Sequence, residues 1–483
     1  MIWIKRICFL FGVLLLGTAA LGALWGGVKF ALYDQLDNEV HLGGKQDYLE
    51  RIRRLPQEDD RPNIVFILFD DLGYGDLGVT GSQAIATPYI DQLAEQGITL
   101  TNFYAPAPVC TPSRAGFLTG RLPLRAGMPS VVFPSESPMS TPHKLFGANI
   151  RIPAEEITLA DVFLAAGYAT GMVGKWHLGD QSPSLPNDMG FQEYFGALYS
   201  NDMTPFALHR NRDVEIAAPA DQSRLNEWYQ REASQFIQHH SDGAFFLYFA
   251  HNFPHIPLYS PDQDKGRSKG GLYGDVVEGL DDVVGRVVAT LKSEGVYDNT
   301  IILITSDNGP WYQGSPGYSR GRKGDTFEGG VHVPMIIHWP ARLAGGRTID
   351  GISMGTDWFP TLLDWLQLPL PDDRIIDGKS LREMLEAQQP SPHDYLYHFS
   401  GERLMAVRDS RYKYHDRRHV VYTTSSIPVG LPVSKGPWLF DTATDANESY
   451  DISTNEPDVT ERLEKALELK RREMKQNMRG WVN

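Results

Sequence analysis

Short apolar runs alternate with longer segments of mixed polarity along most of the chain. Uninterrupted runs of this kind are typical of strands buried on both faces of a parallel sheet. Predicted strands span residues 63–69, 99–104, 169–173, 245–250, 300–305 and 334–339. Helical periodicity and capping residues predict helices at 88–96, 113–120, 158–166, 221–239 and 274–294. This alternation indicates an α/β fold with a large mixed, mostly parallel sheet flanked by helices.

The pattern changes near residue 390. After a predicted helix at about 381–388, the chain has short strand-like segments at 395–400, 404–408, 411–415 and 438–441, and then a charged helix at 457–478. Short strands that follow one another closely favour antiparallel pairing. The sequence therefore predicts a main domain at 62–390 and a smaller C-terminal antiparallel α+β subdomain at 391–483.

The N-terminal segment 1–30 differs from everything that follows. Lys5 and Arg6 precede an uncharged, largely apolar run at 7–28, long enough to span a bilayer. A cleaved signal peptide and an uncleaved transmembrane anchor both fit this pattern. Either one would export the rest of the chain to a periplasmic or extracellular location, with membrane attachment in the second case. Residues 31–61 are polar without a clear period and are interpreted as a linker.

Composition narrows the class of protein. The chain has 483 residues, of which 42% are hydrophobic and 22% charged, as is ordinary for a globular domain. The formal net charge of −15 argues against non-specific nucleic-acid binding, so no nucleic-acid partner is expected. Cys8 lies in the N-terminal apolar run and Cys110 is the only other cysteine, so no disulfide is expected.

Polar residues follow two of the predicted strands directly. Asp70 and Asp71 come after the strand at 63–69, and Asp307 and Asn308 come just after the strand at 300–305. Each pair alone fits a turn or a helix cap. Two pairs at the carboxyl edge of one sheet favour a site with carboxylate and amide oxygens, which suits Ca²⁺ or Mg²⁺ better than Zn²⁺.

Cys110 lies in a stretch that favours an anion site. In Val-Cys-Thr-Pro-Ser-Arg-Ala-Gly-Phe-Leu-Thr-Gly-Arg (109–121), Pro112 suits the start of a helix. Backbone N–H groups and Arg114 would then lie near the cysteine side chain. The alternative is a buried apolar cysteine without a chemical role.

The stretch resembles the signature of the formylglycine-dependent, arylsulfatase-like sulfatases of the alkaline-phosphatase superfamily, Cys-x-Pro-Ser-Arg followed by Leu-Thr-Gly-Arg. In that family a separate maturation enzyme oxidises the cysteine to formylglycine (3-oxoalanine). Further segments are similar to family motifs in the same order: Gly-Lys-Trp-His-Leu-Gly with Lys175 and His177, Pro-His-Ile-Pro with His255, and Gly-Arg-Lys-Gly-Asp-Thr-Phe-Glu-Gly-Gly with Lys323. Ser200 in Tyr-Ser-Asn-Asp matches a looser pattern.

The resemblance implies a role for each matching residue. It implies a divalent ion, usually calcium, held by Asp70, Asp71, Asp307 and Asn308 together with the formylglycine at Cys110. It implies that Arg114 and Lys175 hold the hydrated aldehyde and that Asp307 helps to deprotonate it. Lys175, Lys323 and Ser200 would bind the sulfate. His255 with Lys323 would protonate the leaving alcohol, and His177 would assist release of sulfate.

The resulting hypothesis is a sulfuric ester hydrolase that acts on an exported or extracellular sulfate ester, such as a sulfated carbohydrate. One alternative is a phosphatase, phosphodiesterase or phosphonate monoester hydrolase of the same superfamily. Another is a tethered carbohydrate-binding protein without activity. Trp311, Tyr312, His209, Arg210 and Arg212 lie in loops near the motifs and are further candidates for substrate contact.

Overall fold

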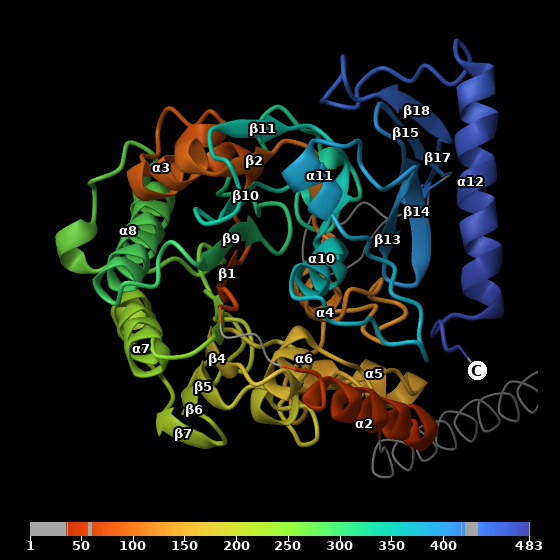
Figure 1. Ribbon diagram of the computed structural model, residues 1–483. Helices are drawn as coiled ribbons and strands as arrows, with labels where there is room; N and C mark the ends of the chain where they lie inside the picture. The colour runs from red at the N-terminus through yellow and green to blue at the C-terminus, as the bar shows by residue number, and fades with distance from the viewer. Residues whose placement is uncertain (1–34, 36, 57–59, 417, 421–432, 483) are drawn as a thin grey trace, which may run out of the picture.

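The computed structural model describes residues 35, 37–56, 60–416, 418–420 and 433–482 (Figure 1). The predicted anchor or signal segment at 1–30 lies outside these residues. Within the described ranges, none of the helices combines the length and the apolar character needed to cross a bilayer.

The centre of the molecule is a ten-stranded sheet with the strand order β11-β2-β10-β9-β1-β8-β4-β5-β6-β7. The middle strands from β9 to β5 run parallel, and β10, β6 and β7 join by antiparallel pairing. The strands are β1 (Asn63–Phe69), β2 (Ile98–Leu100), β4 (Ala169–Gly174), β5 (Glu193–Gly196), β6 (Leu208–Arg210), β7 (Asp213–Ile216), β8 (Phe245–Ala250), β9 (Thr300–Ser306), β10 (Met335–His338) and β11 (Arg347–Ile349).

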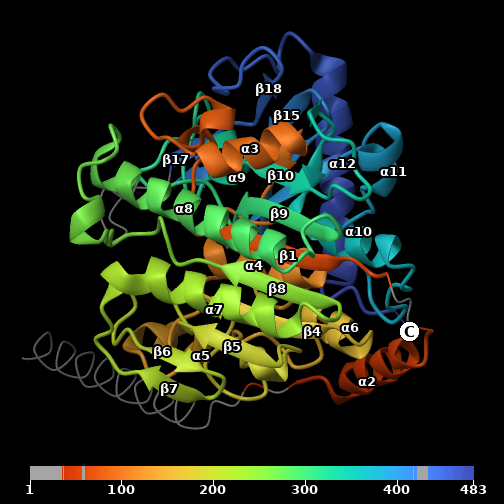
Figure 2. The ribbon, with the colours of Figure 1, turned by 60° about the vertical axis from the view of Figure 1, so that its left-hand side comes forward.

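Helices cover both faces of this sheet (Figures 1 and 2). Alternate residues of β1 point into two separate cores: Ile64 and Phe66 into one, Val65 and Ile67 into the other. The first core contains α4 (Cys110–Thr119), α6 (Leu159–Ala165) and α10 (Trp358–Trp365), and the second contains α3 (Pro88–Gln96), α7 (Leu225–His240) and α8 (Gly271–Ser293). Burial on both faces explains why the central strands are continuous apolar runs.

A second, antiparallel sheet forms the C-terminal part of the fold. Its strands are β13 (Leu396–Ser400), β14 (Arg403–Arg408), β15 (Tyr412–His415) and β18 (Trp438–Asp441), and α12 (Pro457–Gln476) packs along it. Smaller elements are α5 (Thr141–Phe146), α9 (Glu328–Val331), α11 (Arg382–Ala387), and the strand pairs β3 (Phe103–Tyr104) with β12 (Ser353–Met354) and β16 (Arg418–Val420) with β17 (Val433–Lys435). The predicted fold class, a mostly parallel α/β sheet with a smaller antiparallel C-terminal part, is confirmed.

The segment 31–61, predicted to be a linker, contains the packed helix α2 (Glu39–Arg53). Its buried positions are Lys45, Tyr48, Leu49 and Ile52, spaced i, i+3, i+4 and i+7 as on one helix face. Lys45 is buried because its ammonium pairs with Asp161 at 2.8 Å. A lysine at a core position hid the helical pattern in the sequence.

Two other local predictions need correction. The predicted strand at 99–104 is divided between β2 and β3, which belong to different sheets, because Thr101 and Asn102 bend the chain between them. The helix that carries the cysteine motif begins at Cys110 itself, so Pro112 is its third residue. Pro112 is tolerated there because the first-turn N–H groups have no partner within the helix.

Candidate active site

Two pairs of polar residues meet at the carboxyl end of the central strands. Asp70 and Asp71 follow β1, and Asp307 and Asn308 follow β9, its parallel neighbour. The Asp71 amide donates to Asp307 Oδ1 at 3.2 Å, and Asn308 Nδ2 donates to Asp71 Oδ1 at 2.7 Å. The φ of Asp71 is 65°, in the left-handed region that aspartate tolerates better than most residues. The structure thus brings all four side chains together.

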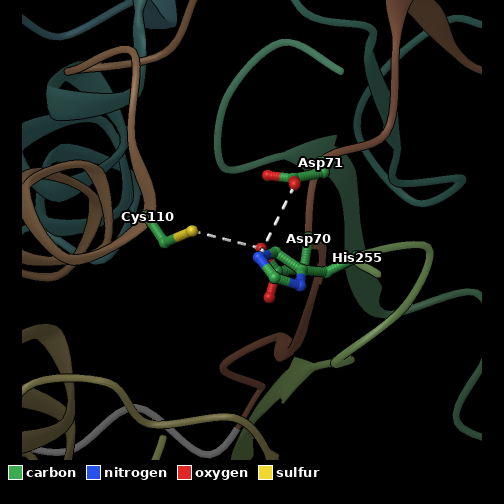
Figure 3. A group of neighbouring side chains, drawn as sticks. All are labelled: Asp70, Asp71, Cys110 and His255. Atoms are coloured by element: carbon green, nitrogen blue, oxygen red, sulfur yellow. Dashed lines mark hydrogen bonds and ion pairs between the residues drawn. The ribbon is translucent and has the colours of Figure 1, made fainter. Parts of the chain in front are cut away.

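Cys110 points toward this cluster from the first turn of α4 (Figure 3). Its Sγ lies 3.3 Å from Asp70 Oδ1 and 3.2 Å from Lys323 Nζ. Burial, with a further contribution from Asp70, raises the pKa of the Cys110 thiol far above its ordinary value. Because the thiolate is the nucleophilic form, an unmodified Cys110 is a poor nucleophile in this environment.

Two buried cations pair with the carboxylates. Lys175 follows β4, and its ammonium donates to the Asp70 carboxylate and, at 3.2 Å, to Ser200 Oγ. Arg114 on α4 donates through Nε to Asp307 Oδ2 at 2.9 Å and through Nη1 to the Lys175 carbonyl oxygen at 2.7 Å. Burial opposes ionisation of Asp70, but Lys175 and the neighbouring cations hold the pKa of Asp70 well below its usual range. Asp70 is therefore an anion.

Lys323 enters the site from the turn before α9. Its amide donates to Pro310 O at 3.0 Å, and the Gly324 amide donates to Pro108 O at 2.8 Å. These bonds attach the turn both to the loop after β9 and to the loop before α4. The Lys323 ammonium pairs with Asp71 Oδ1 at 2.7 Å. Burial opposes its charge, but Asp71 raises the pKa of Lys323 well above its ordinary value, so the ammonium stays protonated.

Two histidines complete the predicted set, in different positions. His255 Nε2 lies 3.7 Å from Asp71 Oδ2, and the imidazole lies 3.4 Å from Ser200 Oγ. His177 Nε2 lies 3.1 Å from Val132 O, and its Nδ1 has no hydrogen-bond partner among the described residues. Burial is the main reason that the pKa of each histidine lies below 6.5. Both are therefore neutral imidazoles near pH 7.

The oxygen-rich side of the cluster fits a hard divalent cation. Asn308 Oδ1 is buried and has no hydrogen-bond partner in the described ranges. A buried amide oxygen without a donor is suited to ligate a cation. Asp70, Asp71, Cys110 and His255 each place one possible ligand atom within 4.8 Å of the others (Figure 3). Carboxylate and amide oxygens prefer Ca²⁺ or Mg²⁺ to softer metals.

Asp307 differs from the other carboxyls of the site. Burial, and next the nearby charge of Asp70, raise the pKa of Asp307 to about 7, although Arg114 opposes the shift. A carboxyl with such a pKa can gain or lose a proton near neutral pH. The site therefore contains a group suited to proton transfer next to permanently charged ones.

Sequence reasoning missed the residues that fix the Lys323 turn. Glu328, the first residue of α9, is buried and pairs with Lys413 of the C-terminal sheet at 2.8 Å. Glu328 lies within the segment around Lys323 that resembled a family motif, but no local pattern connects it to a residue as distant in the chain as Lys413. Trp311 and Tyr312 are 37% and 72% exposed, and none of the contacts within the described part of the chain places them in the cluster.

The chain matches three protein-family models. The model described as sulfatase matches residues 62–368, more than half of the chain. The model for the C-terminal region of N-sulphoglucosamine sulphohydrolase matches 322–430, and the model for the C-terminal region of aryl-sulfatase matches 391–480.

Curated proteins with similar sequences are named as sulfatases. N-acetylgalactosamine-6-sulfatase of Mus musculus is 37% identical over 378 residues, which cover 73% of this chain and 72% of that protein. Arylsulfatase A of Homo sapiens is 35% identical over 436 residues, which cover 81% and 83%.

Solved structures share the fold. The PsFucS1 sulfatase from Pseudoalteromonas sp. aligns with a TM-score of 0.76 at 27% identity, over 91% of this chain and 95% of that one. The protein Ps i-CgsB, solved in complex with k-i-k-neocarrahexaose, aligns with a TM-score of 0.73 at 27% identity, over 87% and 95%. A phosphonate monoester hydrolase of Agrobacterium radiobacter shares the fold at 20% identity, with a TM-score of 0.60 over 85% and 96%.

Proposed function

The chain belongs to the sulfatase family and hydrolyses sulfate esters, and on that premise we propose how and where it does so. Its substrate is a sulfated carbohydrate outside the cytoplasm, its nucleophile is formylglycine made from Cys110, and its cofactor is one divalent cation. The carbohydrate is supported by the relatives whose names or bound ligand are saccharides. Export is supported by the apolar run at 7–28, and cell fractionation with and without residues 1–30 tests it.

The observation that carries the proposal is the surroundings of Cys110. A sulfate monoester is a stable anion, so its hydrolysis needs a nucleophile and groups that neutralise negative charge. Cys110 lies within 3.3 Å of both an anion, Asp70, and a cation, Lys323. A thiol whose pKa is raised by burial does not meet this need. The hydrate of formylglycine supplies one hydroxyl for attack and a second whose deprotonation allows the product to leave.

Residues around Cys110 position the nucleophile and accept the protons that the reaction releases. Arg114 and Lys175 hold the hydroxyl groups in place, since both lie against carboxylates that border Cys110. Asp307 accepts a proton at the start of the reaction, because its carboxylate belongs to the cluster around Cys110 and is held in place by Arg114 Nε at 2.9 Å. His177, a neutral imidazole whose Nδ1 has no hydrogen-bond partner among the residues that the structure describes, accepts a proton at the end.

A second group of residues binds the sulfate and the alcohol part of the substrate. Lys175 and Lys323 are protonated donors for the sulfate oxygens, and Ser200 adds a hydroxyl 3.2 Å from the Lys175 ammonium. His255 and Lys323 both lie against Asp71, and the protonated Lys323 ammonium supplies the proton that reaches the departing alcohol oxygen by way of the His255 imidazole. Water exclusion by this buried site strengthens each of these electrostatic interactions.

Asp70, Asp71, Asp307 and Asn308 would hold the cation, together with the modified Cys110. Ca²⁺ and Mg²⁺ both suit these oxygen ligands. When bound, the cation supplies Lewis-acid neutralisation of charge on the sulfate oxygens. The same carboxylates then need less compensation from the lysines, which frees Lys175 and Lys323 for the substrate.

The test is a paired assay on 4-nitrophenyl sulfate and 4-nitrophenyl phosphate, with enzyme made beside a formylglycine-generating enzyme. A phosphate monoester carries about two negative charges near neutral pH, and a sulfate monoester carries one. A site with one divalent cation and three carboxylates is better suited to the singly charged sulfate ester than to the doubly charged phosphate ester. We expect kcat/KM to be at least about tenfold higher for the sulfate ester. A preference for the phosphate or a phosphonate ester would support the phosphohydrolase alternative instead.

A further inference from the structure

A cavity of about 630 Å³ adjoins the candidate active site. Ser200 lines this cavity, and its Oγ lies 3.2 Å from the Lys175 ammonium and 3.4 Å from the His255 imidazole. Its volume falls within the range of about 300–1,000 Å³ that is usual for small-molecule sites. Because Ser200 borders both the cavity and the Lys175–His255 side of the candidate active site, the cavity is placed to receive the part of the substrate attached to the departing oxygen.

The charged side chains that line the cavity are carboxylates, whereas the sulfate is expected to contact the ammonium groups of Lys175 and Lys323. Glu136 and Asp180 line it, and its lining includes no lysine or arginine among the described residues. His209 also lines it, and burial keeps the pKa of His209 below its ordinary value, although Asp180 opposes the shift, so the ring is neutral near pH 7. Lys144 is not part of the lining, and it donates to the carbonyl oxygen of Ser135 at 2.6 Å.

Hydrogen bonds and burial fix the polar groups of the wall. Asp180 Oδ2 accepts from the amide and the hydroxyl of Ser135, at 2.9 Å and 3.0 Å. Burial, with a smaller contribution from Asp180, raises the pKa of Tyr199 well above its ordinary value, so its hydroxyl stays protonated. Phe206 adds an apolar surface. Carboxylates and an aromatic ring together suit a molecule with several hydroxyl groups and an apolar ring face.

We propose that this cavity binds the alcohol part of the substrate and selects a neutral, polyhydroxylated sugar ring. The inference rests on the proposed function and adds to it which sugar rings the enzyme prefers. Glu136 and Asp180 accept hydrogen bonds from sugar hydroxyls and repel a second sulfate or a carboxylate on the same ring. Repulsion of this kind selects between ligands that present the same reactive group. The preferred substrate is therefore a sugar ring whose only anionic group is the sulfate to be removed.

The experiment compares monosulfated galactoses, with the sulfate at each ring hydroxyl, with the disulfated galactoses that contain the best of them. We expect wild-type enzyme to have at least a tenfold lower kcat/KM for each disulfated sugar. The double variant Glu136→Gln, Asp180→Asn should reduce this difference to threefold or less. Glu136→Gln alone, at an exposed position that leaves the Asp180 hydrogen bonds intact, should reduce it partly.

A matched control removes the same charge elsewhere. Asp47 and Asp242 are exposed and lie outside the cavity, so Asp47→Asn, Asp242→Asn should keep the wild-type discrimination. Equal kcat/KM on mono- and disulfated sugars, with 4-nitrophenyl sulfate still hydrolysed, would overturn the inference alone. Unchanged discrimination in the cavity double variant would also overturn it. Failure to hydrolyse 4-nitrophenyl sulfate as well would overturn the proposed function, and this inference with it.

Discussion

Lys323 is the residue that connects the nucleophile, the carboxylate cluster and the leaving group. Its ammonium lies 3.2 Å from Cys110 Sγ and 2.7 Å from Asp71 Oδ1. Because Asp71 keeps it protonated, Lys323 can bind the sulfate and also stabilise the departing alkoxide with His255. The two roles differ in kinetics, since only an interaction that grows in the transition state raises kcat.

Lys323→Ala is expected to lower kcat by roughly 10²- to 10⁴-fold, the usual contribution of a proton-delivering group, with a smaller rise in KM. The loss should be larger for a sugar sulfate than for 4-nitrophenyl sulfate, because 4-nitrophenol leaves without assistance. Steady-state kinetics on both esters measure this. Lys465→Ala, at an exposed position of α12, is the control. A change confined to KM would reduce Lys323 to a substrate anchor.

Asp71→Asn tests the cation site while keeping a residue that tolerates the left-handed φ of 65°. Loss of one carboxylate ligand should reduce bound metal well below one ion per chain. Activity should fall by about 100-fold or more, because a bound cation provides several kcal/mol of charge stabilisation. Elemental analysis and sulfate release are the measurements, and Asp47→Asn is the control. Stoichiometric metal in the variant, or full activity of wild-type enzyme after chelation, would contradict the assignment.

At the scale of elements, a buried polar network joins the C-terminal sheet to the Lys323 turn. The Glu328 carboxylate accepts from Lys413 at 2.8 Å and from the Tyr104 hydroxyl at 2.7 Å. The Glu328 amide donates to Glu448 at 2.6 Å, and the Gly330 carbonyl accepts from the Gly309 amide at 3.0 Å. The network thus holds α9 against the loop after β9. A continuous series of contacts therefore connects the C-terminal sheet to the turn that contains Lys323.

Lys413→Met is expected to lower the free energy of unfolding by about 3–5 kcal/mol, because it leaves the buried Glu328 carboxylate without its closest cation. Arg411→Met, at the residue just before β15, is the matched control. Arg411 is 54% exposed in its ion pair with Asp441, so its loss should cost about 1 kcal/mol or less. Urea denaturation measures both. Equal stability of the two variants would contradict the structural importance of the network.

Elements with a strong local pattern could be predicted from the sequence, and those that depend on distant partners could not. β8 and α3 have the predicted bounds, since an apolar run and a proline start define them locally. The pairs Asp70–Asp71 and Asp307–Asn308 lie close together because parallel strands end at one edge of the sheet. α2 was missed because Lys45 occupies a core position that only Asp161 makes acceptable.

At the scale of the whole molecule, the C-terminal segment returns to the N-terminal helix. The Trp481 ring stacks on His41 of α2 at 3.8 Å between ring centroids. The guanidinium groups of Arg121, Arg374 and Arg479 lie 4.7, 5.0 and 5.0 Å from the same ring. Figure 2 shows the C-terminus beside α2. The Trp481 ring therefore joins the C-terminal segment to α2.

Trp481→Ala is expected to destabilise the fold by about 2–3 kcal/mol, somewhat less than a fully buried tryptophan, because the ring is half-buried. Tyr450→Ala removes an aromatic ring that is 76% exposed and should have little effect. Thermal unfolding followed by circular dichroism compares the two. An unchanged transition in Trp481→Ala would show that the C-terminal segment adds nothing to stability.

The central claim is that turnover depends on an oxidised Cys110. The most direct measurement combines peptide mass spectrometry of Cys110 with inorganic sulfate release, on preparations made with increasing amounts of a formylglycine-generating enzyme. We predict that sulfate release is proportional to the converted fraction of Cys110 and passes through the origin, with Cys110→Ala at background. Full activity in a preparation whose Cys110 is entirely an unmodified thiol would contradict the account.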